Sequence, residues 1–403
     1  MSASAEARAP GSRPDGPLAG EWREAASQAQ RAALPRGRVV VSCKAPLGVG
    51  GLGRHLSEIV DALAAAAQPT TCICDSTRAS ASGVARRSAR HMLGIPYLTT
   101  ALRALPIPTS VGVRARAAYL EFDAYAARRL PDAEHLIAFN GQALEQFRAA
   151  RRAGYESVAL VSANPHLRRV ARQHALAHSR YPLEGSWAAR LLDRNLAEYG
   201  QADRIYVASR YTRESFLEEG IPEELLSDFP LTPDPRYTPD PRYTPAVAPE
   251  PSDRFEVVYV GSLAVHKGVP LLIDAIRRLP NEDVRLRLVG GWGTPGMRRF
   301  VESACAADRR ISVCPGDPLS HLRAARLCVH PAYEDGFAYA PAEALATGIP
   351  VLVSADTGMK ELIDPGRDGL ILPTGDLDVL TETIEAAYRG EILTAPGARA
   401  ADE

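Results

Sequence analysis

The sequence predicts an α/β protein of two domains, each a parallel sheet with helices on both faces. At 403 residues the chain is long enough for about two domains. Short apolar segments alternate with amphipathic segments of about ten to fifteen residues, the pattern of a doubly wound parallel sheet. A proline-rich repeat, TPDPRY twice and then TP, occupies residues 232–245 and separates two such series.

The first series predicts strands at residues 37–42, 70–74, 135–140 and 157–162, and a shorter one within 202–209. Together with the helices between them, these strands form an N-terminal domain of residues 37–230. Residues 1–36 are rich in Ala, Pro, Arg and Ser. This composition favours a disordered tail, with helical character near residues 22–33.

The second series predicts strands at residues 255–260, 285–289, 311–313, 327–329 and 351–354, in a C-terminal domain of residues 253–388. Residues 389–403 form a short tail. Proline cannot donate a backbone hydrogen bond, so the dense repeat is incompatible with a helix or a central strand. We interpret residues 231–252 as an interdomain linker lengthened by the duplication.

Composition excludes several classes of function. The formal net charge is −1, so no overall basic field attracts nucleic acid. No apolar run reaches the roughly 18–20 residues that span a bilayer, and the N-terminus lacks the apolar core of a signal peptide. The six cysteines lie in or near apolar runs, as buried reduced thiols do, so we expect a cytoplasmic protein without disulfides.

The candidate functional residues are most concentrated in residues 330–357. An apolar strand precedes an acidic loop, a helix with Pro341 near its first turn follows, and a second strand begins after a glycine. In such strand–helix–strand units ligands bind where strand C-termini meet helix N-termini. Asp335 and Glu343 lie at that edge, beside the amides of Phe337 and Ala338.

This stretch resembles the donor-site motif of the GT-B glycosyltransferases of retaining family 4, and the resemblance extends over residues 37–385. The family shows a Glu, then Gly-Phe-Gly, then a second Glu after seven intervening residues. Here Asp335, Gly336, Phe337 and Ala338 are followed by Glu343 at that spacing. The first acid is Asp instead of Glu, and Glu334 precedes it, so both acids remain candidates for that role.

The loop after residues 255–260 carries a second part of the resemblance. In the family an Arg and a Lys there hold the donor diphosphate; Lys267 matches the Lys, and Ser262 stands where the Arg is usual. The chain has only three lysines, each near a glycine in a strand-to-helix loop. A compact ammonium group suits a loop that faces phosphate.

The glycine-rich loop after the first strand has two interpretations. Gly48, Gly50 and Gly53 match the dinucleotide-binding spacing, and Asp75 follows the second strand at a suitable distance. The family resemblance instead implies that the pair Gly50 and Gly51 approaches the donor. In both interpretations glycine lets backbone amides reach a phosphate at a helix N-terminus.

The sequence gives fewer indications of which residues bind the acceptor. His166 follows a strand end, where it either caps the helix that follows or, as the resemblance implies, has a catalytic role near the transferred sugar. Residues 78–129 hold nine arginines against two acids, which suits either a solvated helical face or peripheral contact with the inner face of a membrane. Asp376 and Asp378 imitate a metal-binding DxD, but they open the last helix and we interpret them as a cap.

The resemblance thus implies transfer of a sugar from a nucleotide-diphosphate donor to a small-molecule, glycan or lipid-linked acceptor, with retention and without metal or cofactor. In this scheme Lys267 and the amides of Phe337 and Ala338 hold the diphosphate. Glu343 binds the ribose, and Asp335 binds the sugar or lies beneath its anomeric carbon.

Two other functions remain open. An NAD(P)-dependent oxidoreductase would use the loop of Gly48, Gly50 and Gly53, but gives no account of Glu343. A non-catalytic GT-B-like protein would keep the fold and bind a sugar nucleotide or a partner. The departures from the family pattern at Asp335, Ser262 and Ala338 are its support.

Overall fold

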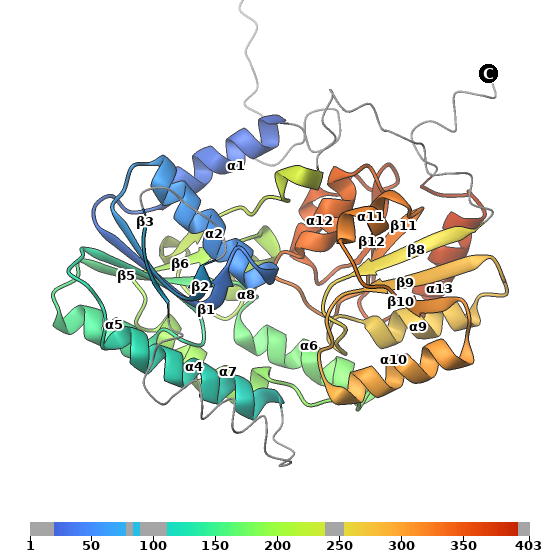
Figure 1. The fold of residues 1–403 in the computed structure, drawn as a ribbon, viewed down its shortest axis with the longest axis horizontal. Coiled ribbons are helices and arrows are strands. Elements are labelled where there is room, and N and C mark those ends of the chain that lie inside the picture. The colour runs from blue at the N-terminus through green and yellow to red at the C-terminus, as the bar shows by residue number, and fades with distance from the viewer. Residues whose placement is uncertain (1–19, 78–83, 89–110, 238–253, 394–403) are drawn as a thin grey trace, which may run out of the picture.

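The computed structural model contains two parallel sheets side by side, each covered by helices (Figure 1). The structure describes residues 20–77, 84–88, 111–237 and 254–393. The strand order is β3-β2-β1-β4-β5-β6-β7 in the first sheet and β10-β9-β8-β11-β12-β13 in the second. The α/β arrangement expected from the sequence is confirmed, whereas the exact domain boundaries remain a prediction.

The first sheet changes direction of winding between β1 and β4, which are neighbours although two strands separate them in sequence. Val41 of β1 pairs with Cys72 on one side and with Ile137 on the other. The strands are β1 (Val39–Leu47), β2 (Thr70–Thr77), β3 (Val84–Ser88), β4 (His135–Phe139), β5 (Ser157–Ser162), β6 (Arg204–Val207) and β7 (Leu226–Asp228).

Successive residues of these strands face opposite layers of helices, which is why both kinds of position are apolar. Val39 and Val41 pack toward α2, whereas Val40 packs with α4 and α5 on the other face. The helices are α1 (Gly20–Ala33), α2 (Gly50–Ala65), α4 (Val111–Ala127), α5 (Leu144–Arg152), α6 (Leu167–Arg180), α7 (Ala188–Tyr199), α8 (Arg210–Leu217), with the short 3₁₀ turns η2 (Glu223–Leu225) and η3 (Pro235–Tyr237).

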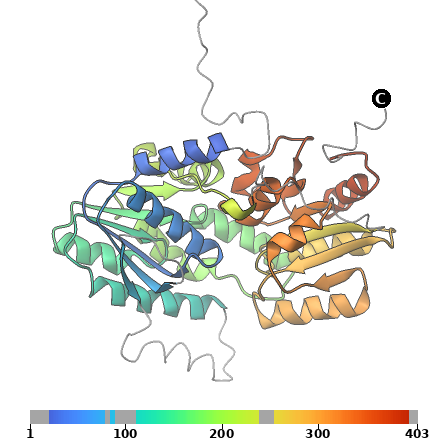
Figure 2. The ribbon, with the colours of Figure 1, turned by 45° about the horizontal axis from the view of Figure 1, so that its top comes forward.

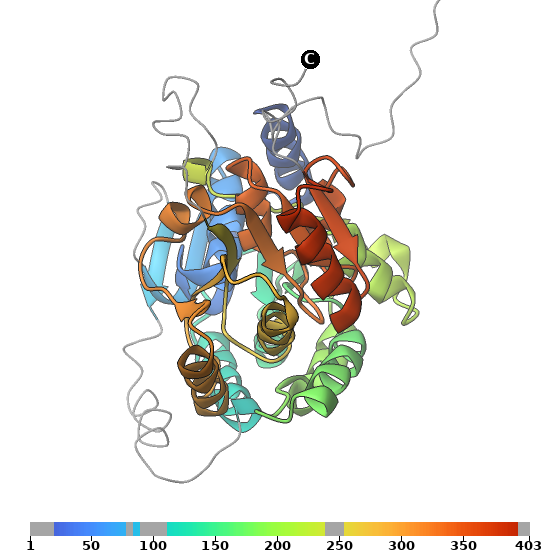
Figure 3. The ribbon, with the colours of Figure 1, turned by 90° about the vertical axis from the view of Figure 1, so that its right-hand side faces the viewer.

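The second sheet has the corresponding switch between β8 and β11. Its strands are β8 (Phe255–Val260), β9 (Val284–Val289), β10 (Ile311–Val313), β11 (Leu327–His330), β12 (Val351–Ser354) and β13 (Gly369–Leu372). Helices α9 (Val269–Arg278), α10 (Pro295–Ala307) and α13 (Leu377–Tyr388) pack on one face, and α9 and α10 are seen nearly end-on in Figure 3. Helices α11 (Pro318–Arg323) and α12 (Tyr339–Ala346) cover the other face, and η4 (Gly358–Leu362) follows β12.

The cap interpretation of the DxD-like pair is confirmed. Asp376 precedes α13, and its Oδ1 accepts hydrogen bonds from the backbone N–H groups of Asp378 and Val379, both at 3.0 Å. An acidic N-cap satisfies amides that have no partner within the helix and complements the helix dipole. Asp376 is therefore already engaged in holding the start of α13.

The helical character expected near residues 22–33 is confirmed, but this part of the N-terminal segment is packed on the domain instead of forming a disordered tail. Residues 20–33 form α1, which lies along the outside of α2 at the upper edge of the first domain (Figure 2). Gln30 is buried, and its Nε2 donates to Glu58 Oε2 at 3.0 Å and to the Pro230 carbonyl at 2.7 Å. These long-range hydrogen bonds order a segment whose composition alone favours disorder. Residues 1–19 lie outside the described residues.

Two other expectations fall partly outside the described chain. Within the Arg-rich stretch 78–129, the structure describes β3 and α4 but not residues 78–83 and 89–110. Of the proline-rich repeat it describes residues 232–237, which include η3. Among the described helices, none combines the length and the apolar character that a bilayer crossing requires.

The two domains are joined along a seam of hydrogen bonds and apolar packing. On the α6 side, Tyr181 Oη donates to Asp274 at 2.7 Å, and Glu184 accepts from Val265 N at 2.8 Å and from Thr294 Oγ1 at 2.7 Å. One apolar cluster runs continuously from α2 across the seam to α12. The seam thus holds the C-terminal edges of the two sheets toward each other.

Candidate functional site

A cavity of about 660 Å³ lies between the two domains, a volume typical of small-molecule sites. It is lined by the loops that follow β1, β4 and β5 of the first sheet and β8 and β11 of the second. This is the edge where ligands bind in open α/β sheets, beside the switch points of both sheets. Most predicted site residues line it: Gly50, Gly51, Ser262, Lys267, Asp335, Phe337, Ala338 and Glu343.

Lys267 and Asp335 form an ion pair in this cavity. Lys267 Nζ lies 3.0 Å from Asp335 Oδ2 and 3.1 Å from the carbonyl oxygen of Glu334. His330 Nε2 lies 3.1 Å from the same Asp335 oxygen. Burial raises the pKa of Asp335, but Lys267 and His330 outweigh it and hold this pKa well below its usual range. Burial by itself lowers the pKa of Lys267, but the Asp335 carboxylate outweighs burial and raises this pKa above its ordinary value. Both members of the pair are therefore ionised at neutral pH.

The structure separates the two candidates for the first acid. Asp335 lines the cavity, with one-fifth (20%) of its side chain exposed. The Glu334 side chain is fully buried and meets His174 instead, with 3.3 Å between His174 Nε2 and Glu334 Oε1. Neighbouring side chains of an extended segment point in opposite directions, so only one of the two acids faces the cavity. That acid is Asp335.

Glu343 lies in the first turns of α12, with only 4% of its surface exposed. Its carboxylate forms an ion pair with Arg54 of α2, across the seam. The Arg54 guanidinium also lies over the Tyr339 ring, 4.0 Å from its centroid. Burial raises the pKa of Glu343, and Arg54 offsets only part of that shift. Glu343 is thus a buried carboxylate that faces the cavity and has one cationic partner.

Arg54 is a cavity residue that sequence reasoning missed. It directly follows the glycine loop whose members Gly50 and Gly51 line the cavity. That adjacency is the one local signal that could have identified it. Its partner Glu343 is 289 residues away in sequence, so the contact itself has no sequence signature.

The glycine loop favours the cavity interpretation over the dinucleotide one. Gly50 has φ of +67°, a left-handed conformation that suits glycine, where α2 begins beside the cavity. Gly53 packs closely on the strand, since a Cβ there would lie 2.0 Å from the Pro46 carbonyl oxygen. Asp75, the proposed ribose ligand of an oxidoreductase, does not line this cavity and lies 3.5 Å from Lys44 Nζ.

Gly336 and Ala338 shape the loop that leads into α12. Gly336 lies at the seam instead of in the cavity lining, and its carbonyl accepts from Ser209 Oγ at 2.7 Å and Thr212 Oγ1 at 3.1 Å. Ala338 has φ of +68°, which is strained for a residue with a Cβ. It immediately precedes α12, and among the described residues no side chain caps the N-terminus of this helix. The first amides of α12 therefore remain free to bind an anion.

The expectation that His166 reaches into the cleft is wrong. The His166 ring is buried between Tyr199 and Phe216, at centroid distances of 4.8 Å and 5.2 Å. Its Nδ1 accepts from the backbone N–H of Arg168 at 3.4 Å, as a cap for α6. Burial lowers its pKa to about 4. The same loop instead contributes Ala163 and Asn164 to the cavity lining.

Comparison with known proteins agrees with this geometry. Residues 254–389 match the family model described as glycosyl transferases group 1. O-antigen chain mannosyltransferase B of Escherichia coli is 30% identical over 153 residues, 35% of this chain and 39% of that protein. A D-inositol 3-phosphate glycosyltransferase of Xylanimonas cellulosilytica is 31% identical over 163 residues, covering 38% and 39%. The chain thus spans about two-fifths of the length of these curated relatives.

Solved structures extend the likeness to both domains. Sucrose-phosphate synthase from Thermosynechococcus elongatus has a TM-score of 0.65 at 18% identity, covering 88% of this chain and 90% of that one. WaaG, a glycosyltransferase involved in lipopolysaccharide biosynthesis, has a TM-score of 0.59 at 17% identity, covering 87% and 90%. Anabaena HepE in complex with UDP-glucose has a TM-score of 0.57 at 18% identity, covering 88% and 91%. The chain therefore has the two-domain fold of these glycosyltransferase structures, and residues 254–389 match the glycosyl transferases group 1 model.

Proposed function

We propose that this protein is a glycosyltransferase that moves a sugar from a nucleotide-diphosphate donor to an acceptor, with retention and without a metal ion in the cleft. One observation carries the proposal. A single interdomain cavity brings together the cation of Lys267, the carboxylates of Asp335 and Glu343, and the uncapped N-terminus of α12. These groups belong to the domain that matches the family model.

The diphosphate would bind between Lys267 and the first amides of α12. A helix N-terminus concentrates amide N–H groups and a partial positive charge, and a preorganised cation adds to it as the leaving group gains charge. Ser262 supplies no charge where related enzymes have Arg. Arg54 is a further cation in the same cavity, contributed by the first domain.

Glu343 would accept hydrogen bonds from two ribose hydroxyls, which are stronger with an ionised acceptor than with a neutral one. In the structure the Arg54 guanidinium pairs with this carboxylate. Asp335, held ionised by Lys267, would bind sugar hydroxyls or stabilise the positive charge that develops at the anomeric carbon. Both acids thus contact the donor from the second domain.

Thermal stabilisation by a panel of UDP-, GDP-, ADP- and dTDP-sugars, with NAD and NADP alongside, tests the proposal. We expect one sugar nucleotide to raise the unfolding midpoint, because a ligand that binds only the folded state stabilises it. The shift should disappear in Glu343→Gln and persist in Glu302→Gln on the exposed face of α10. A shift with NAD or NADP alone would overturn the proposal in favour of an oxidoreductase.

Donor affinity should weaken as the pH falls. Burial raises the pKa of Glu343, and the ionised carboxylate is the form that accepts both ribose hydroxyls. Binding is therefore complete above that pKa and is lost as the pH falls through it, at a higher pH than for a Glu of ordinary pKa near 4.3. Calorimetric titrations from about pH 8 to about pH 4 should show this loss in the native protein. A profile as steep in Glu343→Gln would assign the pH dependence to another group.

A further inference from the structure

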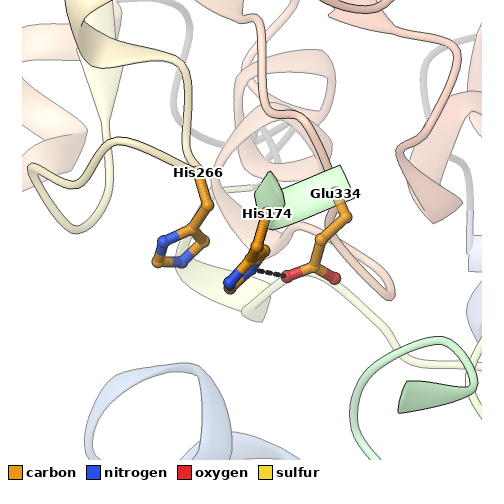
Figure 4. A group of neighbouring side chains, drawn as sticks. All are labelled: His174, His266 and Glu334. Atoms are coloured by element: carbon orange, nitrogen blue, oxygen red, sulfur yellow. Dashed lines mark hydrogen bonds and ion pairs between the residues drawn. The ribbon is translucent and has the colours of Figure 1, made fainter. Parts of the chain in front are cut away.

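Three side chains from both domains meet behind the cavity wall. His174 comes from α6, His266 from the loop between β8 and α9, and Glu334 from the loop between β11 and α12 (Figure 4). Each offers one nitrogen or oxygen atom, and these three atoms all lie within 4.8 Å of one another. The His174 and His266 rings are stacked with 4.5 Å between their centroids. The cluster therefore spans the seam between the domains.

The cluster contains polar atoms that the protein itself does not satisfy. The side chains of His174 and Glu334 are fully buried. Glu334 Oε2 has no hydrogen-bond partner, although a buried carboxylate oxygen without one is costly. Among the described residues, neither ring nitrogen of His266 has a hydrogen-bond partner, and this side chain is only partly buried. An unpaired carboxylate oxygen beside two imidazoles points to a missing cation.

The surroundings of His174 suit a metal ligand. Its Nδ1 lies 3.1 Å from Ser186 Oγ, which can accept the Nδ1 proton. Metal-binding histidines commonly donate their second N–H to such an oxygen, which leaves the other nitrogen unprotonated for the ion. Here that nitrogen is Nε2, which points toward Glu334 (Figure 4). In this tautomer His174 Nε2 carries no proton, so it cannot donate a hydrogen bond to Glu334. A cation between the two would bind both the ring nitrogen and the carboxylate oxygen.

We propose that His174, His266 and Glu334 form a binding site for a divalent transition-metal ion, preferably Zn²⁺, that links the two domains. Two imidazoles and one carboxylate are a ligand set typical of zinc, with the fourth position open to water. The 3.3 Å between His174 Nε2 and Glu334 Oε1 matches the edge of a tetrahedron whose bonds to zinc are about 2.0–2.1 Å long. The His266 ring, which is stacked on His174, would have to rotate about its side-chain bonds to coordinate the same ion.

This ion would be separate from the sugar-transfer chemistry. Glu334 immediately precedes Asp335, and His266 immediately precedes Lys267, yet neither Glu334 nor His266 lines the cavity. The ion would hold the two loops that present Lys267 and Asp335, and so fix the distance between the domains behind the cleft. The inference does not rest on the proposed function, because metal binding is measured without donor or acceptor.

Titration of tag-free, chelator-treated full-length protein with Zn²⁺ and with Co²⁺ tests the proposal. We expect one ion per chain by calorimetry and elemental analysis, a visible Co²⁺ spectrum typical of tetrahedral nitrogen and oxygen ligands, and a rise of the unfolding midpoint on addition of Zn²⁺. Absence of stoichiometric binding of both ions would overturn the proposal and leave a hydrogen-bonded His–Glu pair with a stacked ring.

Two variants distinguish ligation from packing. His266→Phe keeps an aromatic ring stacked on His174 but removes a ligand, and Glu334→Gln keeps an acceptor for a hydrogen bond but loses the charge. Both should lose stoichiometric binding and the Zn²⁺-dependent rise in midpoint. His321→Gln in α11, outside the cluster, should keep both. Binding of Zn²⁺ by His266→Phe and Glu334→Gln as tight as in the native protein would overturn the assignment. If both variants fail to fold, the Zn²⁺ and Co²⁺ titration of the native protein alone decides whether the protein binds one ion per chain.

Discussion

Replacing Lys267 with alanine is expected to lower kcat/KM for sugar transfer by at least about 100-fold, the usual effect of removing one preorganised charge from a transition-state site. The substitution removes the cation that faces the leaving diphosphate. It also leaves Asp335 with His330 as its remaining partner. Loss of one member of a buried ion pair costs about 3–5 kcal/mol of folding free energy. We expect the lower end of this range, because the Asp335 side chain is 20% exposed.

The double variant Lys267→Ala/Asp335→Asn separates these two effects. It removes the unpaired carboxylate, so unfolding free energy measured in urea should recover most of its loss, while sugar transfer stays at the level of the single variant or below. Lys360→Ala is the matched control, since Lys360 lies in η4, outside the cavity lining, and donates to the Ala355 carbonyl at 2.6 Å. A folded Lys267→Ala variant with near-native kcat/KM would refute the role of Lys267.

Gly336→Ala is expected to impair transfer without unfolding either domain. A Cβ at this position would lie 2.4 Å from the carbonyl oxygen of Ala163 and 3.1 Å from Asn164 Cα, both backbone atoms of the first domain. The added methyl group would force the two domains apart beside Asp335 and strain the hydrogen bond from Ser209. Displacement of catalytic groups by about 1 Å can cost about 100-fold in rate, and we expect a loss of this order in kcat/KM.

The stability of Gly336→Ala should fall by about 1–3 kcal/mol, as is usual for one methyl group too many in a packed region. Gly291→Ala provides the control, because it lies in a strand-to-helix loop of the same domain and a Cβ there would meet nothing within 4 Å. Steady-state kinetics and urea unfolding should be measured on both variants. Native-like kinetics in a folded Gly336→Ala variant would show that the seam adapts without displacing the catalytic groups.

The central strands could be predicted from the sequence because both faces of each sheet are covered. Strands β5 (SVALVS) and β8 (FEVVYV) therefore contain the unbroken apolar runs of residues 158–161 and 257–260. The edge strand β3, with the sequence VARRS, was not predicted, because an edge position does not demand an apolar run. The helical character of residues 22–33 was predicted, but the packing of α1 on the domain was not, because the contacts of Gln30 with Glu58 and Pro230 join distant segments.

The candidate site also combines residues that a local motif predicts with residues whose positions depend on distant contacts. Asp335, Ala338 and Glu343 belong to one local motif, and their common position at the cavity followed from strand–helix order. Arg54 was not predicted, because it meets Glu343 across 289 residues of sequence. His166 was assigned wrongly because a histidine after a strand can turn either way. Packing against Tyr199 and Phe216, which local sequence does not reveal, turned it inward.

The cavity between the domains is also expected to be the last part of the molecule to form. Domains usually fold as units during synthesis, the N-terminal one first. The contact of Arg54 with Glu343 spans 289 residues, and that of Tyr339 with Glu58 spans 281. Until the second domain is complete, the first domain presents the apolar surface of α2 to solvent without its partner. Donor binding would therefore report that both domains have folded and docked, because one folded domain by itself does not form the cavity.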